Sequence, residues 1–98
     1  MTQKIHTYTA SGDILSTTAG TFWDEVSKII DTLSSSEVLR LDLRASTMVD
    51  SVGLNAVVKI IRAVSDLGSK VQILIASDYL KKLCAFTRLD EKAEIIGP

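Results

Sequence analysis

The 98-residue sequence is poor in the residue types that form disulfides or bind metals, with one cysteine, one histidine and one proline. A single cysteine cannot form a disulfide within the chain, and one histidine beside one cysteine cannot complete a zinc site. No apolar run approaches the roughly 20 residues that a membrane-spanning helix needs. These scarcities disfavour a disulfide-stabilised domain and an integral membrane protein, and we expect no cofactor and no bound metal.

The sequence also lacks an excess of either charge, with 11 Lys and Arg against 12 Asp and Glu and a net charge of −1. A nucleic-acid-binding domain usually carries a clear positive excess, so we expect no nucleic-acid partner. A hydrophobic fraction of 46% with 23% charged residues is typical of a globular chain, and the length fits one domain, residues 1–98. Residues 1–6 lack the apolar segment of a secretory signal, so we expect a cytoplasmic protein without direct membrane insertion.

Apolar residues alternate, or recur at helical spacing, along most of the chain. The pattern predicts strands at 4–9, 38–44, 71–76 and 93–96, and helices at 18–33, 51–67 and 78–89. Alternating strands and helices are typical of an α/β fold with a mostly parallel sheet. One side of strand 38–44 is polar, with Arg40, Asp42 and Arg44, so we expect about four strands with helices packed mainly on one face.

The predicted core lies between the sheet and helix 51–67. Its members share strand or helix periodicity: Leu39, Leu41, Leu43, Val57, Val58, Ile61, Ile73 and Ile75. Cys84 has a helical core setting, so we expect a buried and inert thiol. Trp23 falls off the apolar stripe of helix 18–33, so it is either at the flank of the core or partly exposed and available for contacts. Gly68 should end helix 51–67, and Asp78 should cap the helix that follows.

The stretch Asp50-Ser51-Val52-Gly53 stands where strand 38–44 leads into helix 51–67. In open α/β sheets, this carboxyl edge of the strands is where ligands and partners usually bind. Asp50 suits the N-cap of the helix, and Ser51 then falls in the first turn with its hydroxyl outside. Gly53 has no side chain and would let another group approach the helix start closely.

Several functions place an acid, a serine and a glycine together in this way. A hydrolase nucleophile elbow is disfavoured because Val49 replaces its first glycine and the sole histidine, His6, precedes the serine. A phosphate-binding loop is disfavoured because it needs further glycines and a lysine, and because Asp50 would repel the anion. A purely structural cap stays open, as does a phosphorylation switch at Ser51, whose hydroxyl a kinase could reach.

The longer stretch around these residues resembles the STAS domain family, which includes sulphate transporters and anti-sigma-factor antagonists. Residues 39–58, LRLDLRASTMVDSVGLNAVV, are similar to the family pattern of an apolar strand, a short loop and Asp-Ser-small-Gly-Leu opening a helix. A weaker match is Gly12-Asp13-Ile14 followed by Thr18-Ala19. The resemblance implies a single-domain STAS-like fold and a binding protein rather than an enzyme.

By the same resemblance, the chain would be a bacterial anti-sigma-factor antagonist that works by partner switching. Ser51 would be phosphorylated by the anti-sigma factor, itself a serine kinase, and a matching phosphatase would reset it. The residues implied in partner binding are Asp13, Asp50, Ser51, Val52, Gly53 and Asn55. Two positions depart from the pattern, because Leu15 replaces an aspartate and Val52 replaces a second small hydroxyl residue. The alternative is a small STAS subunit that docks on the ATPase of a bacterial ABC-type phospholipid-trafficking transporter.

Overall fold

The computed structural model describes residues 4–97, which alternate strands and helices as the sequence predicts. The elements are β1 (Ile5–Thr9), α1 (Ala19–Ile30), β2 (Val38–Asp42), α2 (Ser51–Asp66), β3 (Lys70–Leu74), α3 (Asp78–Phe86), the short 3-10 helix η1 (Leu89–Glu91) and β4 (Glu94–Ile96). The four strands form one parallel sheet in the order β1-β2-β3-β4. The predicted α/β class and parallel sheet are therefore confirmed.

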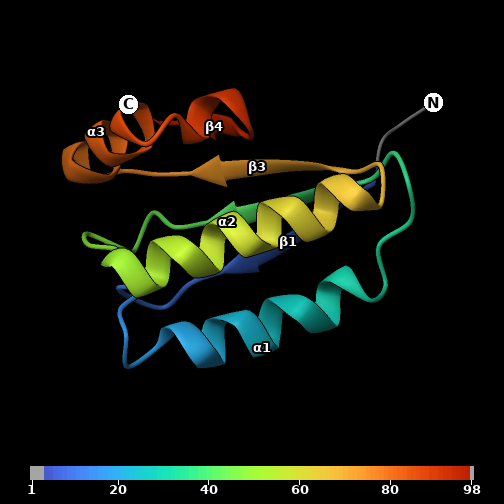
Figure 1. The fold of residues 1–98 in the computed structure, drawn as a ribbon, viewed down its shortest axis with the longest axis horizontal. Coiled ribbons are helices and arrows are strands. Elements are labelled where there is room, and N and C mark those ends of the chain that lie inside the picture. Colours follow the sequence, from blue (N-terminus) through green and yellow to red (C-terminus); the bar gives the residue numbers. More distant parts are fainter. Residues whose placement is uncertain (1–3, 98) are drawn as a thin grey trace.

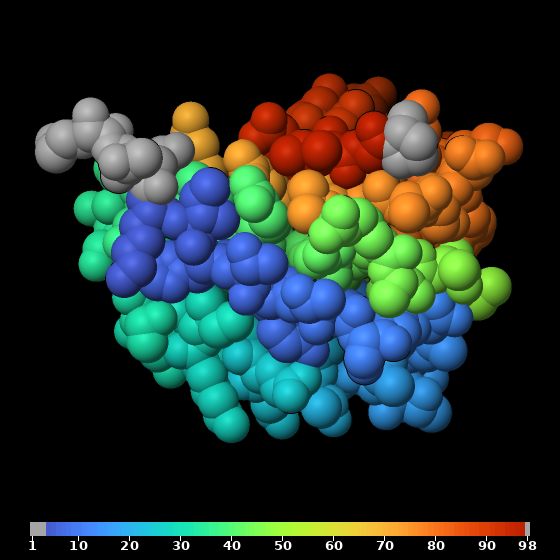
Figure 2. Space-filling view, turned by 180° about the vertical axis from the view of Figure 1, so that it is seen from behind, coloured from blue at the N-terminus to red at the C-terminus, as the bar shows by residue number. Residues whose placement is uncertain are grey.

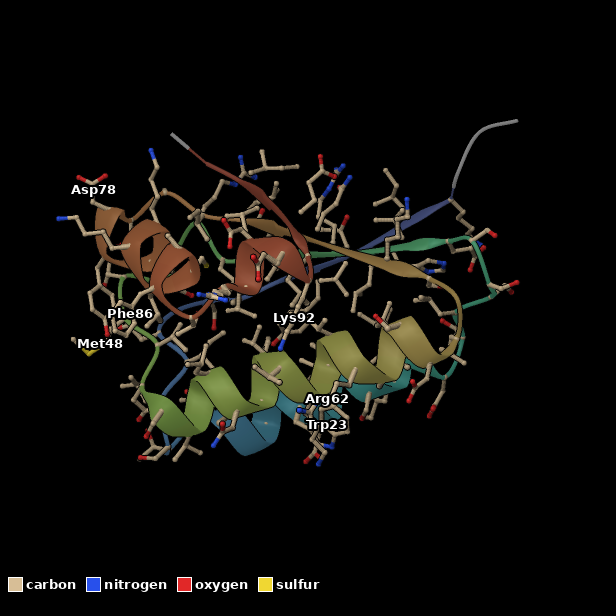
Figure 3. The ribbon with its side chains drawn as sticks, turned by 45° about the horizontal axis from the view of Figure 1, so that its top comes forward. Trp23, Met48, Arg62, Asp78, Phe86 and Lys92 are labelled. Atoms are coloured by element: carbon tan, nitrogen blue, oxygen red, sulfur yellow. The ribbon has the colours of Figure 1, made fainter. Side chains whose placement is uncertain are left out.

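The helices cover one face of this sheet. Figure 1 shows α1 and α2 side by side along the strands, and the two helices are in contact. Figure 3 shows η1 and α3 on the same side of the sheet as α2. From behind, in Figure 2, residues of the strands form much of the surface and α2 is largely hidden. Helices packed mainly on one face were predicted, and the structure confirms it.

The open face of the sheet carries polar side chains, and these side chains hydrogen-bond from one strand to the next. The guanidinium of Arg40 donates to the side-chain oxygen of Gln72 at 2.9 and 3.1 Å, and the Gln72 amide donates to Glu94 at 2.8 Å. Asp42, predicted to be on the exposed polar side, is only 8% exposed. Arg44 shields it with two hydrogen bonds of 2.8 and 2.9 Å, and this contact holds the pKa of the Asp42 carboxyl below its ordinary value.

The core matches the predicted set with two differences. Seven of the eight predicted residues are buried, but Val58 is only partly buried at the flank of α2. Ile60, which was not predicted, is completely buried because the side of α2 that faces the sheet runs through Gly53, Val57, Ile60 and Val64. The actual stripe is thus turned slightly from the predicted one.

Other local predictions can also be compared with the structure. Cys84 is buried, and burial raises the pKa of its thiol, as expected for an inert core cysteine. Trp23 is half-buried and packs at the flank of the core, and the Lys59 ammonium lies 4.2 Å from the centre of its ring. Gly68 takes a φ of +78° just beyond α2, which fits its predicted role as a helix stop. Capping of α3 by Asp78 is wrong, because the Ser77 hydroxyl accepts from the Leu80 N–H instead.

Several predicted elements are a few residues too long. The chain leaves α1 after Ile30, although Leu33 is still buried, and β2 ends at Asp42 rather than at residue 44. In both places apolar residues continue past the end of regular structure because the connecting loop packs on the same core. Among residues 4–97, no helix is long and apolar enough to cross a membrane.

Candidate functional site

The candidate site is formed by two loops that run side by side at the carboxyl edge of β1 and β2. One loop connects β1 to α1, and the other connects β2 to α2. The Ile14 N–H donates to the Met48 carbonyl at 3.2 Å, and the Asp50 N–H donates to the Ile14 carbonyl at 3.2 Å. These bonds extend the pairing of β1 with β2 into the loops, so the two segments form one surface.

Asp13, in the loop between β1 and α1, binds the loop between β2 and α2. One of its carboxylate oxygens accepts from the backbone N–H of Thr47 at 2.7 Å and of Met48 at 3.1 Å, and from the Thr47 hydroxyl at 3.1 Å. These hydrogen bonds to the charged form lower the pKa of Asp13. Asp13, predicted to bind a partner, is therefore already engaged within the chain.

Asp50, in the loop between β2 and α2, binds the loop between β1 and α1. Its Oδ1 accepts from the Gly53 N–H at 2.8 Å, which makes it the N-cap of α2 as predicted, and its Oδ2 accepts from the Ser16 N–H at 2.7 Å. The bonds from Gly53 and Ser16 lower the pKa of this carboxyl. Asp13 and Asp50 thus tie the two loops together reciprocally, each carboxylate accepting backbone N–H groups of the other loop.

Gly53 is required because the first loop touches the start of α2. The residue is buried, and a β-carbon placed on it would lie 2.9 Å from the Ile14 carbonyl carbon and closer still to the oxygen. The close approach that the sequence suggested is thus made by this chain's own backbone. Ser46, which sequence reasoning missed, adds to the same contact, since its completely buried hydroxyl donates to the Gly12 carbonyl at 2.6 Å.

Ser51 lies at the outer surface of this arrangement. It is exposed, it is the first residue of α2, and no residue within 4–97 is recorded in a hydrogen bond to its hydroxyl. Asn55 is exposed one helical turn further on, on the same side of the helix. Val52 follows Ser51 directly and is 47% exposed, and Met48, three residues before Ser51, is 50% exposed. Ser51 is therefore an accessible hydroxyl between the Asp50 carboxylate and the exposed apolar side chain of Val52.

The loop before α3 joins the same edge. The Ser77 hydroxyl donates to the Thr47 carbonyl at 3.3 Å and so links that loop to the one that carries Met48. Phe86, at the end of α3, is 89% exposed, and Figure 3 shows it at the same end of the molecule as Met48. The sequence analysis missed this residue. Its position outside the apolar stripe of a short helix could have indicated an exposed aromatic side chain.

The acidic side chains of the site are engaged within the chain. Within the described part of the chain, no three His, Cys, Asp or Glu side chains are grouped so that they could hold a metal ion. The two aspartates accept backbone hydrogen bonds, so they are positioned as structural acceptors rather than as an acid and base pair. What the edge presents to solvent is a hydroxyl, an amide and apolar side chains.

A comparison of the sequence with known families matches the STAS domain over residues 1–96. The chain belongs to the STAS domain family. Its sheet, helices and motif loop are those of an α/β STAS fold, as the resemblance implied. Among curated proteins, none matches this sequence.

Two solved structures share the fold of this STAS domain. A proposed anti-sigma factor antagonist from Thermotoga maritima superposes with a TM-score of 0.83 at 17% identity, covering 94% of this chain and 78% of that chain. A sulfate transporter family protein from Wolinella succinogenes gives a TM-score of 0.70 at 17% identity, covering 94% of this chain and 75% of that one. At such identities the likeness shows the fold alone.

Proposed function

We propose that this STAS domain is a cytoplasmic anti-sigma-factor antagonist, a binding protein without catalytic activity that captures an anti-sigma factor while Ser51 is unmodified. The main observation behind the proposal is the exposed position of the Ser51 hydroxyl. Its hydroxyl is exposed at the first residue of α2, on a loop held by hydrogen bonds from both sides. The fold shared with a proposed anti-sigma factor antagonist is consistent with this role.

The predicted partner-binding residues divide into two groups in this proposal. Ser51, Val52 and Asn55 are exposed and would touch the partner directly. Asp13, Asp50 and Gly53 would act as positioning residues. The two carboxylates and the close packing at Gly53 fix the loops and the helix start that carry the exposed group. The partners would be an anti-sigma factor with serine kinase activity and a phosphatase that restores the hydroxyl.

Phosphorylation would change this surface by charge. A phosphoserine carries close to two negative charges at neutral pH, and here it would stand beside the Asp50 carboxylate. An apolar or acidic partner surface would be repelled and would have to desolvate the phosphate. The fold would lose little, because a negative charge in the first turn of α2 lies at the favourable end of the helix dipole.

The test titrates a purified anti-sigma factor of the serine-kinase type against three variants. Ser51→Asp should weaken binding by roughly 10-fold or more, for the reasons of charge and desolvation above. Ser51→Ala should bind as the wild type does and should become insensitive to ATP. Ser35→Asp places the same charge on an exposed serine of a different loop and should leave the affinity unchanged. A melting curve for each variant separates lost binding from lost folding.

Two results would reject the switch. One is Ser51→Asp binding as tightly as the wild type, and the other is a kinase that leaves Ser51 unmodified in the presence of ATP. Either result would make constitutive docking the better account. The protein would then be placed as a small STAS subunit on the ATPase of an ABC-type phospholipid-trafficking transporter.

A further inference from the structure

We propose that the free edge of β1 binds an extended basic segment of another protein, which adds a strand to the sheet and places a Lys or Arg side chain in a pocket between β1 and α1. This surface is built on β1 and α1 rather than on the start of α2, and the inference does not depend on the proposed function. It describes a second binding surface and the chemistry of the segment that would fill it.

The outer edge of β1 presents backbone groups that have no partner among residues 4–97. The Ala10 N–H donates to the Asp42 carbonyl at 3.0 Å, so the even-numbered residues of β1 direct their backbone groups toward β2. Because these groups alternate along a strand, the N–H and C=O of Ile5, Thr7 and Thr9 point away from β2. A second extended chain could pair with them, as in binding by strand addition.

β1 also lacks the features that usually block an exposed strand edge. Its sequence, Ile-His-Thr-Tyr-Thr, contains no proline and no lysine, three of its five residues are β-branched, and it pairs with β2 residue by residue without a bulge. The opposite edge strand, β4, has only three residues and begins with Glu94. Of the two edges, β1 is therefore the one open to another strand.

The position of α1 suits one added strand better than a second copy of the domain. Figure 1 shows α1 beyond β1, on the side away from β2. Antiparallel pairing of two β1 strands would place both sets of helices on the same face of the joint sheet, with the two strands only about 4.8 Å apart. A helix is about 10 Å wide, so each α1 would occupy the space of the other copy's helices. A single extended segment would instead lie over one α1.

A pocket of about 300 Å³ lies between β1 and α1, beside this edge. Its walls include Tyr8 and Phe22, whose rings meet edge to face with their centres 5.6 Å apart. Side chains that lie opposite each other on paired strands project to the same face, so a residue of the added strand beside Tyr8 would point toward α1 and this pocket. The volume is at the lower end for a small-molecule site and suits one long side chain.

The acidic groups of the pocket indicate that the inserted side chain is basic. Glu25 and Asp13 line the pocket, and its lining contains no Lys, Arg or His. One oxygen of Glu25 accepts from the Tyr8 hydroxyl at 2.6 Å, and no hydrogen bond to its other oxygen occurs among residues 4–97. A guanidinium or ammonium beside the Tyr8 and Phe22 rings could therefore pair with the Glu25 carboxylate.

Neighbouring charges do not cancel this acidity. Residues 7–27 contain three acidic residues and no Lys, Arg or His. The Arg44 guanidinium is bound to a carboxylate of β2, and the Lys59 ammonium lies over a tryptophan ring. Lys28, in the next turn of α1, is offset by Asp50 in the adjoining loop. The surface beside β1 thus stays negative after its neighbours are counted.

The test titrates the blocked peptide acetyl-Thr-Val-Thr-Arg-Thr-Val-Thr-amide into the isotope-labelled full chain and follows the backbone amide signals by NMR. The amides of Ile5, Thr7 and Thr9 should shift, with a Kd of about 1 mM or below. The same peptide with Glu in place of Arg should bind at least about 10-fold more weakly, because its carboxylate would meet the acidic pocket. No shift in β1 at about 5 mM peptide, or equal binding of the two peptides, would overturn the inference.

Two matched pairs of variants locate the binding. Thr7→Pro removes an outward-facing N–H and should abolish binding, whereas Thr7→Ala should not, and neither variant loses a hydrogen bond to β2. Glu25→Gln keeps an acceptor for the Tyr8 hydroxyl but loses the charge, so it should weaken binding of the arginine peptide about 10-fold. Asp24→Asn removes an exposed charge outside the pocket and should leave the affinity unchanged.

The variants also decide between the occupants of the edge. Arginine-peptide binding that stays unchanged in either Thr7→Pro or Glu25→Gln would overturn the inference. Self-association of the free protein that disappears in Thr7→Pro would assign the edge to a second copy and would overturn it too. Melting curves identify any variant that fails to fold, and the Glu25→Gln and Asp24→Asn pair decides if Thr7→Pro is lost in this way. Because the experiment contains no anti-sigma factor, its outcome is independent of the proposed switch at Ser51.

Discussion

Gly53 is the residue at which local preference and tertiary demand conflict most clearly. A glycine inside a helix costs stability relative to alanine, yet here any side chain would meet the Ile14 carbonyl. The contact is part of what fixes the loop beside Ser51, so the glycine serves the site rather than the helix. The same reasoning applies to Ser46, whose small buried hydroxyl can reach the Gly12 carbonyl.

Gly53→Ala should destabilise the protein by about 1–3 kcal/mol in urea unfolding, because overpacking against backbone forces the loop or the helix to shift. Gly20→Ala is the matched control, since Gly20 also lies in a helix but a β-carbon there meets nothing within 4 Å. That variant should gain up to about 1 kcal/mol. Equal effects of the two substitutions would mean that the Ile14 contact does not constrain residue 53.

At the scale of elements, the carboxylates of Asp13 and Asp50 join the β1–α1 loop to the β2–α2 loop. Each carboxylate accepts hydrogen bonds from backbone N–H groups of the other loop. Each loop would otherwise have to leave these donors to water, as exposed loops usually do. The bonds convert the carboxyl edge of β1 and β2 into a single platform beneath Ser51. The platform depends on charge, so it should depend on pH.

Asp50→Asn should lower the free energy of unfolding at pH 7 and make it less sensitive to acid. The pKa of Asp50 is lowered in the folded state, so its ionised form contributes stability that is present above the unfolded pKa and lost as pH falls through the folded pKa. The difference between wild type and Asp50→Asn should therefore shrink below about pH 4. Urea unfolding from pH 7 to pH 3 measures it.

Asp50→Ala separates the charge from the cap in the same series. Asparagine can still accept from the Gly53 N–H, whereas alanine cannot, so Asp50→Ala should remain less stable than Asp50→Asn at every pH. A gap between wild type and Asp50→Asn that stays constant from pH 7 to pH 3 would contradict the assigned role of the carboxylate charge.

At the scale of the whole molecule, one core joins the sheet to all three helices. One cluster contains buried residues of the three helices and of the central strands β2 and β3. The edge strands contribute Tyr8 of β1 and Ile95 of β4, which are partly buried and pack against this cluster. Leu41 is central and completely buried in β2. Cooperative, two-state unfolding is the expectation for a small domain built this way.

Leu41→Ala should cost about 2–5 kcal/mol, because it removes buried methyl groups and leaves a cavity. Unfolding can be followed by the fluorescence of Trp23, the one tryptophan, in α1 and by far-UV circular dichroism of the whole chain. Both signals should report the same midpoint in the wild type and the same shift in the variant. A loss below about 1 kcal/mol, or two separated transitions, would mean that Leu41 does not join α1 to the rest of the core.

Local patterns in the sequence determined most of the elements, because helix and strand periods record which side chains face the core. They predicted the alternating order, the Asp50 cap and the outward placement of Ser51, each of which depends on neighbours within one turn or strand. They missed Ile60 because the buried stripe of α2 is turned slightly from the predicted one. They overextended α1 and β2 because apolar residues in the following loops share the core without sharing its regular geometry.

Only the tertiary structure decided what meets at the site. The parallel pairing of β1 with β2 brings Asp13 to Thr47 and Met48, and it brings Ile14 to Gly53. The packing of α3 likewise places Phe86 at the end of the molecule that carries Met48. These contacts join residues far apart along the chain, and no local period encodes them, because the order of strands in the sheet sets which loops become neighbours.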